Sequence, residues 1–288
     1  MRKIPFMKMN GCGNDFIVVD NRQGIMNQYN LPNFIRQVCA RRVSVGADGF
    51  MMVEESSKAD FKMRYFNADG SEGEMCGNGA RCISRFAYLQ GAAENEMTFE
   101  TIAGIYESKI VGDNVCLKFP PVSMNDLQLY QTHEFEGETL DFHYAPVGVP
   151  HVVIYRDDVD TMDYKELFTL GRKIRYADIF SAGTNVNFLK ISDENNIIIR
   201  TYERGVEDET LACGTGSTAS AIISCLLGKT KSPVSMHTRA GILKIYFNIK
   251  EDIIDDLYME GNAKVVVEGY LLPDAWRWQG TVLCHLLR

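Results

Sequence analysis

The distribution of apolar and polar residues along the chain predicts many short strands and two pairs of helices. In the first half, apolar residues recur at helical spacing over 31–42 and again over 77–89, where Gly91 ends the run. Short runs rich in β-branched and aromatic residues lie between these helices and predict strands. The strands expected here are 16–19, 49–54, 61–66, 97–101, 105–111 and 115–119.

The same order recurs after Pro120-Pro121, the clearest internal linker of the chain. Helices are expected over 164–173 and 216–227. The strands expected in this half are 148–154, 187–191, 197–202, 234–237, 242–249 and 257–260, followed by a closing strand over 263–272. We therefore expect two domains: 1–120, joined by a closing segment 263–288, and 121–262.

Two short stretches of the chain are almost identical. Cys76-Gly77-Asn78-Gly79 begins one predicted helix, Cys213-Gly214-Thr215-Gly216 begins another, and the same interval separates each from a Thr-x-Ala-Gly-Ile sequence. Before the two cysteines, Asn67 matches Arg204 and Asp48 matches Asn185. We expect an α+β fold of two pseudo-symmetric domains, each a barrel-like, mostly antiparallel sheet around a central helix, with the active site in the cleft between them.

Each of the two cysteines stands directly before a glycine-rich helix start. The first turn of a helix presents unpaired backbone N–H groups and a positive dipole, so it can bind a carboxylate. The same setting lowers the pKa of a thiol from about 8.5 to between about 3.5 and 7.5. One thiolate can then remove a proton from a carbon while the opposing thiol returns one to the other face. The duplication therefore predicts inversion at a carbon next to a carboxylate, with Cys76 and Cys213 as the acid/base pair.

Composition and charge narrow the class of protein. The chain has 288 residues, of which 45% are hydrophobic and 24% charged, as in a packed globular protein. A net charge of −8 and an isoelectric point near 5.2 argue against nucleic acid as a partner. No apolar run approaches the roughly 18 residues of a membrane helix, and the first residues do not form a secretory signal. Eight cysteines without a Cys-x-x-Cys pair indicate free thiols, so we expect a cytoplasmic protein.

Other interpretations of these motifs are weaker. Neither cysteine stretch completes Gly-x-Gly-x-x-Gly, and Cys76, Cys82 and the histidines lack the spacing of a zinc site, so we expect neither cofactor nor metal. His151 is either a structural or a supporting histidine. Glu203-Arg204 would ordinarily be a surface ion pair, but we expect it at the cleft end of a strand, close before Cys213. The cysteines interpreted as packing residues are Cys12, Cys39, Cys82, Cys116, Cys225 and Cys284.

Together the motifs resemble those of the diaminopimelate epimerases, cofactor-independent enzymes of lysine and cell-wall precursor synthesis. The similarity runs from residue 8 to residue 272, and the motifs are highly specific in combination. They are Lys8-Met9-Asn10-Gly11-Cys12-Gly13-Asn14-Asp15-Phe16, Phe66-Asn67-Ala68-Asp69-Gly70-Ser71-Glu72, Cys76-Gly77-Asn78-Gly79-Ala80-Arg81-Cys82, Pro150-His151, Thr184-Asn185-Val186-Asn187-Phe188, Tyr202-Glu203-Arg204-Gly205 and Ala212-Cys213-Gly214-Thr215-Gly216.

The resemblance implies a role for each matching residue. Cys76 and Cys213 would be the acid/base pair, and His151 and Glu203 would tune their thiols. The residues implied to hold the reacting carboxylate by backbone N–H groups are Gly77, Asn78, Gly214 and Thr215. Those implied to bind the amino groups and the distal carboxylate are Asn14, Asn67, Asn185, Glu203 and Arg204. The implied partner is a small amino-acid substrate, with a homodimer left open.

The chain departs from the family pattern in three places. Val149 stands where many members have Asn before Pro-His, which removes a polar contact expected at the distal end of the substrate. Asn10 replaces the usual His, and residues 273–288 extend past the usual family end. The leading hypothesis is interconversion of LL- and meso-2,6-diaminopimelate. Two alternatives stay open: a racemase of another amino acid on the same scaffold, and a non-catalytic amino-acid-binding protein, which would have no need of the thiols.

Overall fold

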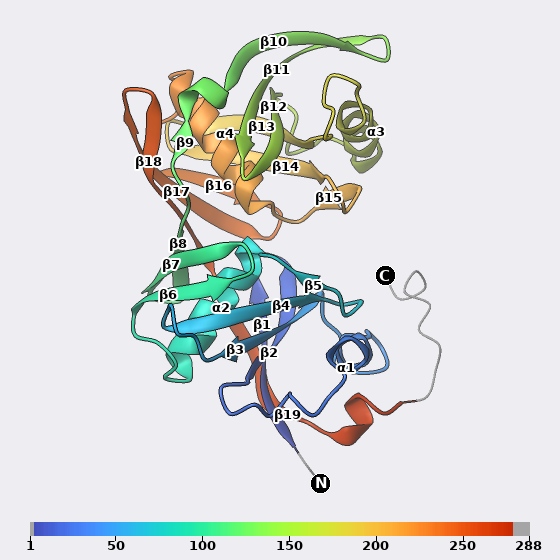
Figure 1. Cartoon of the computed structure of the whole chain (residues 1–288). Coiled ribbons are helices and arrows are strands. Elements are labelled where there is room, and N and C mark those ends of the chain that lie inside the picture. The colour runs from blue at the N-terminus through green and yellow to red at the C-terminus, as the bar shows by residue number, and fades with distance from the viewer. Residues whose placement is uncertain (1–2, 279–288) are drawn as a thin grey trace. The chain divides into compact units, whose positions relative to one another are not determined.

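The computed structural model describes residues 3–278 and divides into two compact units (Figure 1). The N-terminal unit comprises the chain up to Leu117 together with the segment that begins at Gly261, and the C-terminal unit comprises Lys118–Glu260. None of the helices that the structure describes is long and apolar enough to cross a membrane.

In the N-terminal unit a sheet surrounds one central helix. Its strands are β1 (Ile4–Gly11), β2 (Asn14–Asp20), β3 (Gly49–Glu54), β4 (Phe61–Asn67), β5 (Glu72–Gly73), β6 (Glu96–Thr101), β7 (Gly104–Val111), β8 (Asn114–Lys118) and β19 (Lys264–Leu271). They pair in the order β19, β1, β2, β3, β4, β6, β7, β8, with β5 also on β4. Helix α2 (Gly77–Leu89) lies against five of these strands and is buried along most of its length (Figure 1).

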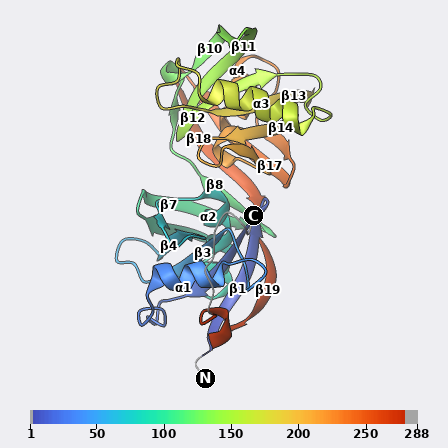
Figure 2. The same ribbon diagram turned by 90° about the vertical axis from the view of Figure 1, so that its right-hand side faces the viewer.

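A second helix, α1 (Leu31–Val38), covers the outer face of this sheet (Figure 2). Successive residues of a strand point to opposite faces, so neighbours along β3 pack against different helices. Phe50 and Met52 belong to the core under α1, where Phe34 stacks edge-on against Phe50. Met51, between them, lies against Gly79 of α2. The sheet is therefore apolar on both faces, as the continuous apolar run of β3 indicates.

The C-terminal unit repeats this plan. Its strands are β9 (Val122–Ser123), β10 (Gln128–Phe135), β11 (Glu138–Val147), β12 (Val149–Tyr155), β13 (Asn185–Asp193), β14 (Asn196–Glu203), β15 (Asp208–Thr210), β16 (Val234–Thr238), β17 (Gly241–Lys250) and β18 (Ile253–Asn262). Helix α4 (Gly214–Leu226) contacts β11, β12, β13, β14, β16 and β17. Helix α3 (Tyr164–Arg175) packs Leu167, Leu170 and Ile174 onto the opposite face of β12 to β14.

The connections between parallel strands show the duplication most clearly. In the N-terminal unit the parallel pair β2 and β3 is joined through α1, and the parallel pair β4 and β6 through α2. In the C-terminal unit β12 and β13 are joined through α3, and β14 and β16 through α4. All other pairings named above are antiparallel. The expected α+β fold, a mostly antiparallel sheet around a central helix in each half, is confirmed.

The repeated Thr-x-Ala-Gly-Ile sequence is a hairpin turn in both units. Thr101 accepts a hydrogen bond from the Ala103 N–H (3.1 Å) and donates one to the Gly104 carbonyl (3.0 Å). Thr238 makes the same two contacts with residues Ala240 and Gly241, at 3.2 and 2.7 Å. Both glycines have φ near +137° (137° and 136°), which a side chain would strain. This part of the duplication is structural.

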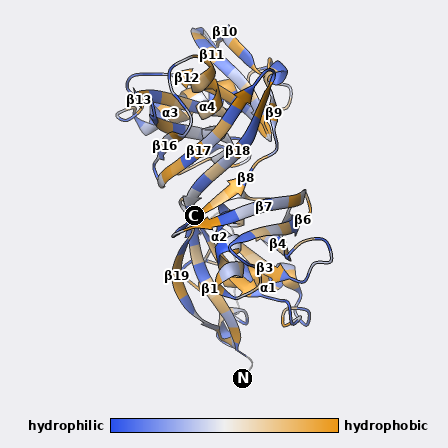
Figure 3. Cartoon of the chain, turned by 90° about the vertical axis from the view of Figure 1, so that its left-hand side faces the viewer, coloured by the Kyte–Doolittle hydropathy of each residue, from blue (hydrophilic) through white to orange (hydrophobic). Residues whose placement is uncertain are grey.

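The hairpin of β10 and β11 was not predicted. Polar residues occupy both faces of these strands, since Gln128, Gln131 and Glu134 interrupt the alternation that marks a half-buried strand, and Figure 3 shows hydrophilic residues along both.

Helix α1 is also shorter than predicted. It ends at Val38 because the backbone N–H groups of Gly46 and Ala47 return to the carbonyls of Val38 and Cys39.

The first part of the extension 273–288 packs onto α1. Trp276 is 8% exposed and stacks against Phe34 and Tyr29, while Ser44 donates a hydrogen bond to the Ala275 carbonyl (2.8 Å). Trp278 donates from its indole to the Gln37 carbonyl (3.3 Å). Residues 273–278 thus cover α1, and Cys284 lies outside the described residues.

Candidate active site

Cys76 and Cys213 are the N-cap residues of α2 and α4, the central helices of the two units. Their backbone conformations match, with φ and ψ of −140° and 117° for Cys76 and −119° and 114° for Cys213. Neither side chain makes the cap hydrogen bond that a serine makes at this position, although hydrogen bonds from the backbone of Thr215 and Gly216 act on the thiol of Cys213. The Cys213 sulfur lies 3.6 Å from the Thr215 hydroxyl.

In the N-terminal unit, Asn78 links the start of α2 to the first strand pair. Its side-chain amide donates to Oδ1 of Asn14 (2.6 Å), and its Oδ1 accepts from the guanidinium of Arg81 (2.7 Å). Arg81 is fully buried, and Asn78 is 7% exposed. The Asn78 side chain is therefore fixed at both ends, and the structure brings Asn14 beside the helix start that carries Cys76.

An ion-pair network orients Asn14 from the other side. The Asn14 amide donates to Asp48 (3.3 Å), whose carboxylate is paired with Arg41 (2.8 Å). Arg41 also pairs with Asp15 (2.6 Å), and Lys8 with Asp15 (2.7 Å). Burial disfavours ionisation of Asp15, but hydrogen bonds and charges from Arg41 and Lys8 outweigh it and lower the pKa of Asp15 to about 2. Asp15 therefore stays charged and keeps the network in place.

Asn67 lies at the end of β4, where its amide is engaged within its own turn. Its Oδ1 accepts from the Tyr65 hydroxyl (2.7 Å), and its Nδ2 donates to the Ser71 hydroxyl (3.0 Å). The turn is tied to the Asp48 loop by the Ala68 N–H, which donates to the Asp48 carbonyl (3.1 Å). Asn67 and Asn14 thus both lie on segments that bond to Asp48.

In the C-terminal unit, Asn185 joins the segments that carry Arg204 and His151. Its Oδ1 accepts from the Arg204 backbone N–H (2.8 Å), and its Nδ2 donates to the Pro150 carbonyl (3.0 Å). The Arg204 guanidinium donates to the Ala182 carbonyl (2.9 Å) and is half-buried. This arrangement leaves Arg204 with a charge at the end of β14 that no carboxylate among the described residues neutralises.

His151 is fully buried in β12. Burial, with a contribution from the Arg204 charge, lowers the pKa of His151 to about 3. The ring is therefore neutral throughout the physiological range. Its Nδ1 lies 3.3 Å from the side-chain nitrogen of Asn187, and its Nε2 has no hydrogen-bond partner within the described part of the chain.

The expectation that a helix N-terminus lowers the thiol pKa is wrong for Cys213. Burial, then the charge of Glu203, raises the pKa of the Cys213 thiol to about 12, although hydrogen bonds from Gly216 and Thr215 act in the opposite direction. Desolvation of the buried sulfur outweighs the helix end. Cys213 is consequently a protonated thiol in this structure, the form that can donate a proton.

Glu203 lies close enough to Cys213 to influence it. Burial raises the pKa of Glu203, and a hydrogen bond from the Thr210 hydroxyl (2.7 Å) opposes that rise. Its carboxylate raises the pKa of Cys213, so the structure brings these two predicted residues together. Glu203 and Arg204 do not form an ion pair with each other: Glu203 accepts a hydrogen bond from Thr210, whereas Arg204 donates to the Ala182 carbonyl.

The second glycine of each cysteine motif makes room for a neighbour. A Cβ at Gly216 would lie 2.3 Å from Oδ1 of Asn187 and 3.3 Å from the Cys213 sulfur. A Cβ at Gly79 would meet the sulfur of Met51 at 3.0 Å. These glycines thus lie close-packed against side chains of the sheet, in addition to baring the helix end for a carboxylate as the sequence suggested.

Two of the three departures from the family pattern, Asn10 and Val149, lie close in sequence to the residues described above. Gly148, with φ of +70°, approaches the Thr215 methyl group, since a Cβ there would be 3.7 Å from it. Val149 follows directly and is half-buried. Asn10 accepts a hydrogen bond from the Gly13 N–H (3.3 Å) and closes the β1–β2 turn.

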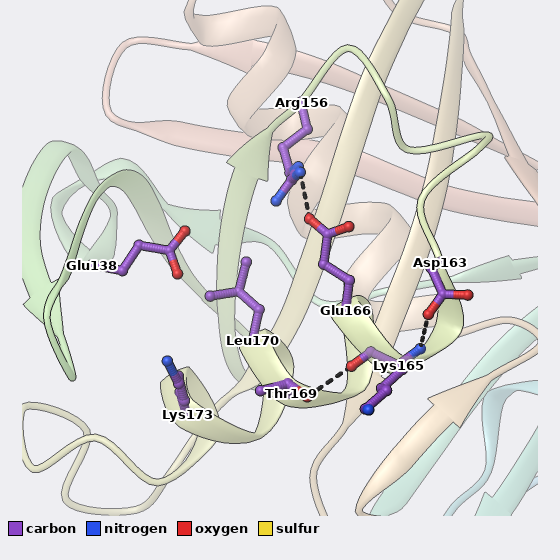
Figure 4. Close-up of a pocket in the computed structure, with 8 residues that line it drawn as sticks. All are labelled: Glu138, Arg156, Asp163, Lys165, Glu166, Thr169, Leu170 and Lys173. Atoms are coloured by element: carbon purple, nitrogen blue, oxygen red, sulfur yellow. Dashed lines mark hydrogen bonds and ion pairs between the residues drawn. The ribbon is translucent and has the colours of Figure 1, made fainter.

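A cavity of about 400 Å³ beside α3 contains none of the predicted site residues (Figure 4). Its polar side chains bond to one another or to the helix backbone: Arg156 pairs with Glu166 (2.7 Å), and Asp163 accepts from the Lys165 N–H at the start of α3 (2.8 Å). Within residues 3–278, no group of three or more His, Cys, Asp or Glu side chains is arranged to hold a metal.

Asn187 and Thr210 were missed as site residues. Asn187 is a polar residue within the apolar run from Val186 to Leu189, and this is the signal that could have found it. Thr210 carries no such signal, because its contact with Glu203 depends on the pairing of β14 with β15.

Comparison with known proteins decides between the alternatives for the family. The sequence model of the family described as Diaminopimelate epimerase matches residues 6–123 and 143–266. The chain is 44% identical to the diaminopimelate epimerase of Archaeoglobus fulgidus over 288 residues, covering 96% of this chain and 99% of that one. It is 41% identical to that of Aquifex aeolicus over 281 residues, covering 93% and 98%. The chain belongs to the diaminopimelate epimerase family. The resemblance seen in the sequence motifs is confirmed, and the family is one of isomerases.

Solved structures show how widely this fold is shared. A phenazine biosynthesis protein of the PhzF family from Bacillus anthracis aligns with a TM-score of 0.71 at 17% identity, covering 94% of this chain and all (100%) of that one. A hydroxyproline epimerase from Agrobacterium vitis aligns with a TM-score of 0.66 at 14% identity, covering 95% and 93%. At this level of identity the comparison shows the fold of a diaminopimelate epimerase family member and not its chemistry.

Proposed function

We propose that the chain interconverts LL- and meso-2,6-diaminopimelate by inverting one α-carbon with two thiols. The observation that carries the proposal is the matched placement of Cys76 and Cys213 at the N-caps of α2 and α4, in a chain that belongs to the diaminopimelate epimerase family. The relative of that name from Archaeoglobus fulgidus shares 44% identity over nearly the full length.

The proposed reaction moves one proton off the α-carbon and another onto its opposite face. One cysteine, as thiolate, takes the proton; the other, as thiol, gives one back, and the reverse reaction exchanges their roles. Cys213 is the donor in the protonation state described above. Glu203 and His151 adjust this balance, Glu203 by its charge and His151 as a neutral ring.

Backbone N–H groups would hold the reacting carboxylate. The residues proposed for this contact are Gly77, Asn78, Gly214 and Thr215, which form the first turns of the two helices. As the α-proton leaves, negative charge builds on this carboxylate, and a preorganised donor of this kind stabilises a transition state by about 3 kcal/mol.

The rest of the substrate would meet the polar side chains fixed around those turns. Those proposed to bind its amino groups and distal carboxylate are Asn14, Asn67, Asn185, Glu203 and Arg204. Arg204 is the member best suited to the distal carboxylate, because its charge has no carboxylate partner among the described residues. We further propose that the reaction needs no cofactor or metal, that it takes place in the reducing cytoplasm that thiol chemistry requires, and that chains associate, if at all, as a homodimer.

Incubation in D₂O without added cofactor tests the activity. LL-diaminopimelate should be converted to the meso form with deuterium at the inverted α-carbon, as read by mass spectrometry, and dialysis against a chelator should leave the rate unchanged. Deuterium in a different amino acid, with diaminopimelate unlabelled, would replace the proposal by a racemase of that amino acid. Binding of diaminopimelate without any deuterium uptake would mean a binding protein.

A further inference from the structure

Asn187 occupies an unusual position for a polar side chain. It lies near the start of β13, fully buried, between Val186 and Phe188 of the apolar core. Its strand pairs with β12 on one side and β14 on the other. Burying an amide costs desolvation free energy that an apolar side chain of similar size would avoid. A buried amide at this position therefore indicates that its hydrogen bonds have a role.

The hydrogen bonds of Asn187 fix which end of its amide faces which neighbour. The Val152 carbonyl, 2.9 Å away, can only accept, so the atom facing it is the NH₂ group. The other end accepts a hydrogen bond from the Thr201 hydroxyl (2.9 Å). The orientation of the amide therefore follows from its partners.

The same NH₂ group faces the His151 ring. The amide nitrogen of Asn187 lies 3.3 Å from Nδ1 of His151 and has a second hydrogen to donate. Nδ1 must therefore accept, and it carries no proton. A neutral imidazole has one ring proton, which must then be on Nε2. Nε2 is buried without a partner among the described residues, so His151 presents a hydrogen-bond donor at that atom.

The oxygen of the Asn187 amide lies against the helix turn that carries Cys213. Gly216 accommodates it, because any Cβ there would be 2.3 Å from Oδ1, and the same Cβ would touch the Cys213 sulfur at 3.3 Å. One side chain thus contacts both the ring of His151 and the first turn of α4.

We propose that Asn187 is a positioning residue that holds His151 in the Nε2–H tautomer and seats the first turn of α4. His151 then acts as a hydrogen-bond donor and not as a base. The consequence for turnover rests on the proposed function, whereas the tautomer itself does not.

The test is the ¹⁵N spectrum of the histidine rings in the full-length chain, with His151→Gln identifying the His151 signals. The wild-type ring should be protonated on Nε2 and unprotonated on Nδ1 at neutral pH. In Asn187→Asp the NH₂ donor is replaced by a carboxylate of the same shape, which accepts, so the proton should move to Nδ1. Thr201→Val is the matched control: it removes the contact to Oδ1 but leaves the NH₂ group facing His151, and it should keep the wild-type tautomer.

Kinetics give the second readout. Asn187→Asp should lower kcat at least about tenfold, as expected when a functional histidine is held in the wrong tautomer, with KM changed less than about threefold. A wild-type ring protonated on Nδ1, or an Asn187→Asp ring that keeps Nε2–H, would overturn the proposal, as would a changed tautomer at unchanged kcat. If Asn187→Asp does not fold, the wild-type and Thr201→Val spectra still decide the tautomer. Absence of wild-type turnover would instead refute the proposed function.

Discussion

At the level of single residues, two opposing influences act on Cys213. Burial and the carboxylate of Glu203 raise the pKa of its thiol, while hydrogen bonds from Gly216 and Thr215 lower it. Glu203 itself is buried, so its charge is weakly screened and reaches the sulfur effectively. Burial, together with the charge of this carboxylate, therefore keeps Cys213 protonated.

This gives a prediction for Glu203→Gln. Removing the negative charge should lower the pKa of Cys213, so that at pH about 8 its alkylation by iodoacetamide becomes faster, up to about tenfold for a shift of one unit. The rate is measured by mass spectrometry of the peptide that carries Cys213. Asp208→Asn is the control. Asp208 lies in the same β14–β15 hairpin as Glu203, and its carboxylate accepts a hydrogen bond from Tyr164 of α3; its removal should leave the rate unchanged. An equal or slower rate in Glu203→Gln would contradict this account of Cys213.

The two cysteines were predictable because the signal is local: a repeated Cys-Gly-x-Gly directly before an apolar helix. The protonation of Cys213 was not, because it depends on burial and on Glu203, which lies at the end of β14. Asn187 was not predicted as a site residue for the same reason. Its importance lies in contacts to His151 and Gly216 that only the pairing of β12 with β13 and the packing of α4 create.

At the level of elements, α3 is held to the sheet by a contact that leaves no room for a side chain. A Cβ at Gly171 would lie 2.5 Å from Cβ and 2.7 Å from Cγ of Tyr202 in β14. These atoms are anchored to a strand and cannot rotate away. The glycine is therefore set by packing and not by helix formation, which glycine disfavours.

Gly171→Ala should accordingly destabilise the protein. Alanine favours a helix over glycine by about 1 kcal/mol, but overpacking a tight contact costs about 1–3 kcal/mol, so we expect a net loss of up to about 2 kcal/mol in the free energy of unfolding. Denaturant unfolding measures it. Lys173→Ala on the same helix should stay within about 0.5 kcal/mol of wild type. A stabilised Gly171→Ala variant would show that the contact can relax.

The spacing of apolar residues predicted helix α2 with the limits that the structure shows, whereas no such pattern predicted the β10–β11 hairpin. A helix that is buried on nearly all sides by a sheet must be apolar at regular positions, and its sequence records this. β10 alternates between exposed and half-buried residues, so its pairing, and not its composition, makes it a strand. The end of α1 was set by returning loop backbone, which no local pattern indicates.

At the level of the whole molecule, the duplication supplies one cysteine from the central helix of each unit. The proposed reaction requires both sulfurs at opposite faces of one carbon. Mild oxidation of the substrate-free protein should therefore link Cys76 to Cys213 in a disulfide that inactivates the enzyme and that dithiothreitol reverses. Peptide mapping with and without diaminopimelate measures the link, and bound substrate should protect. Separate sulfinic acids on the two cysteines would mean that the sulfurs do not meet.

The most direct test of the central claim is the turnover of Cys76→Ser and Cys213→Ser. Each should convert LL-diaminopimelate to the meso form at less than about a tenth of the wild-type rate, a loss of at least about 1.4 kcal/mol, because a serine hydroxyl ionises far less readily than a thiol. Circular dichroism should show both variants folded, and Cys225→Ser, in the last turn of α4, should keep wild-type activity. Loss of activity in both variants, with the control active, is the result predicted; a folded variant of either cysteine that retained more than a tenth of wild-type turnover would contradict the two-thiol mechanism.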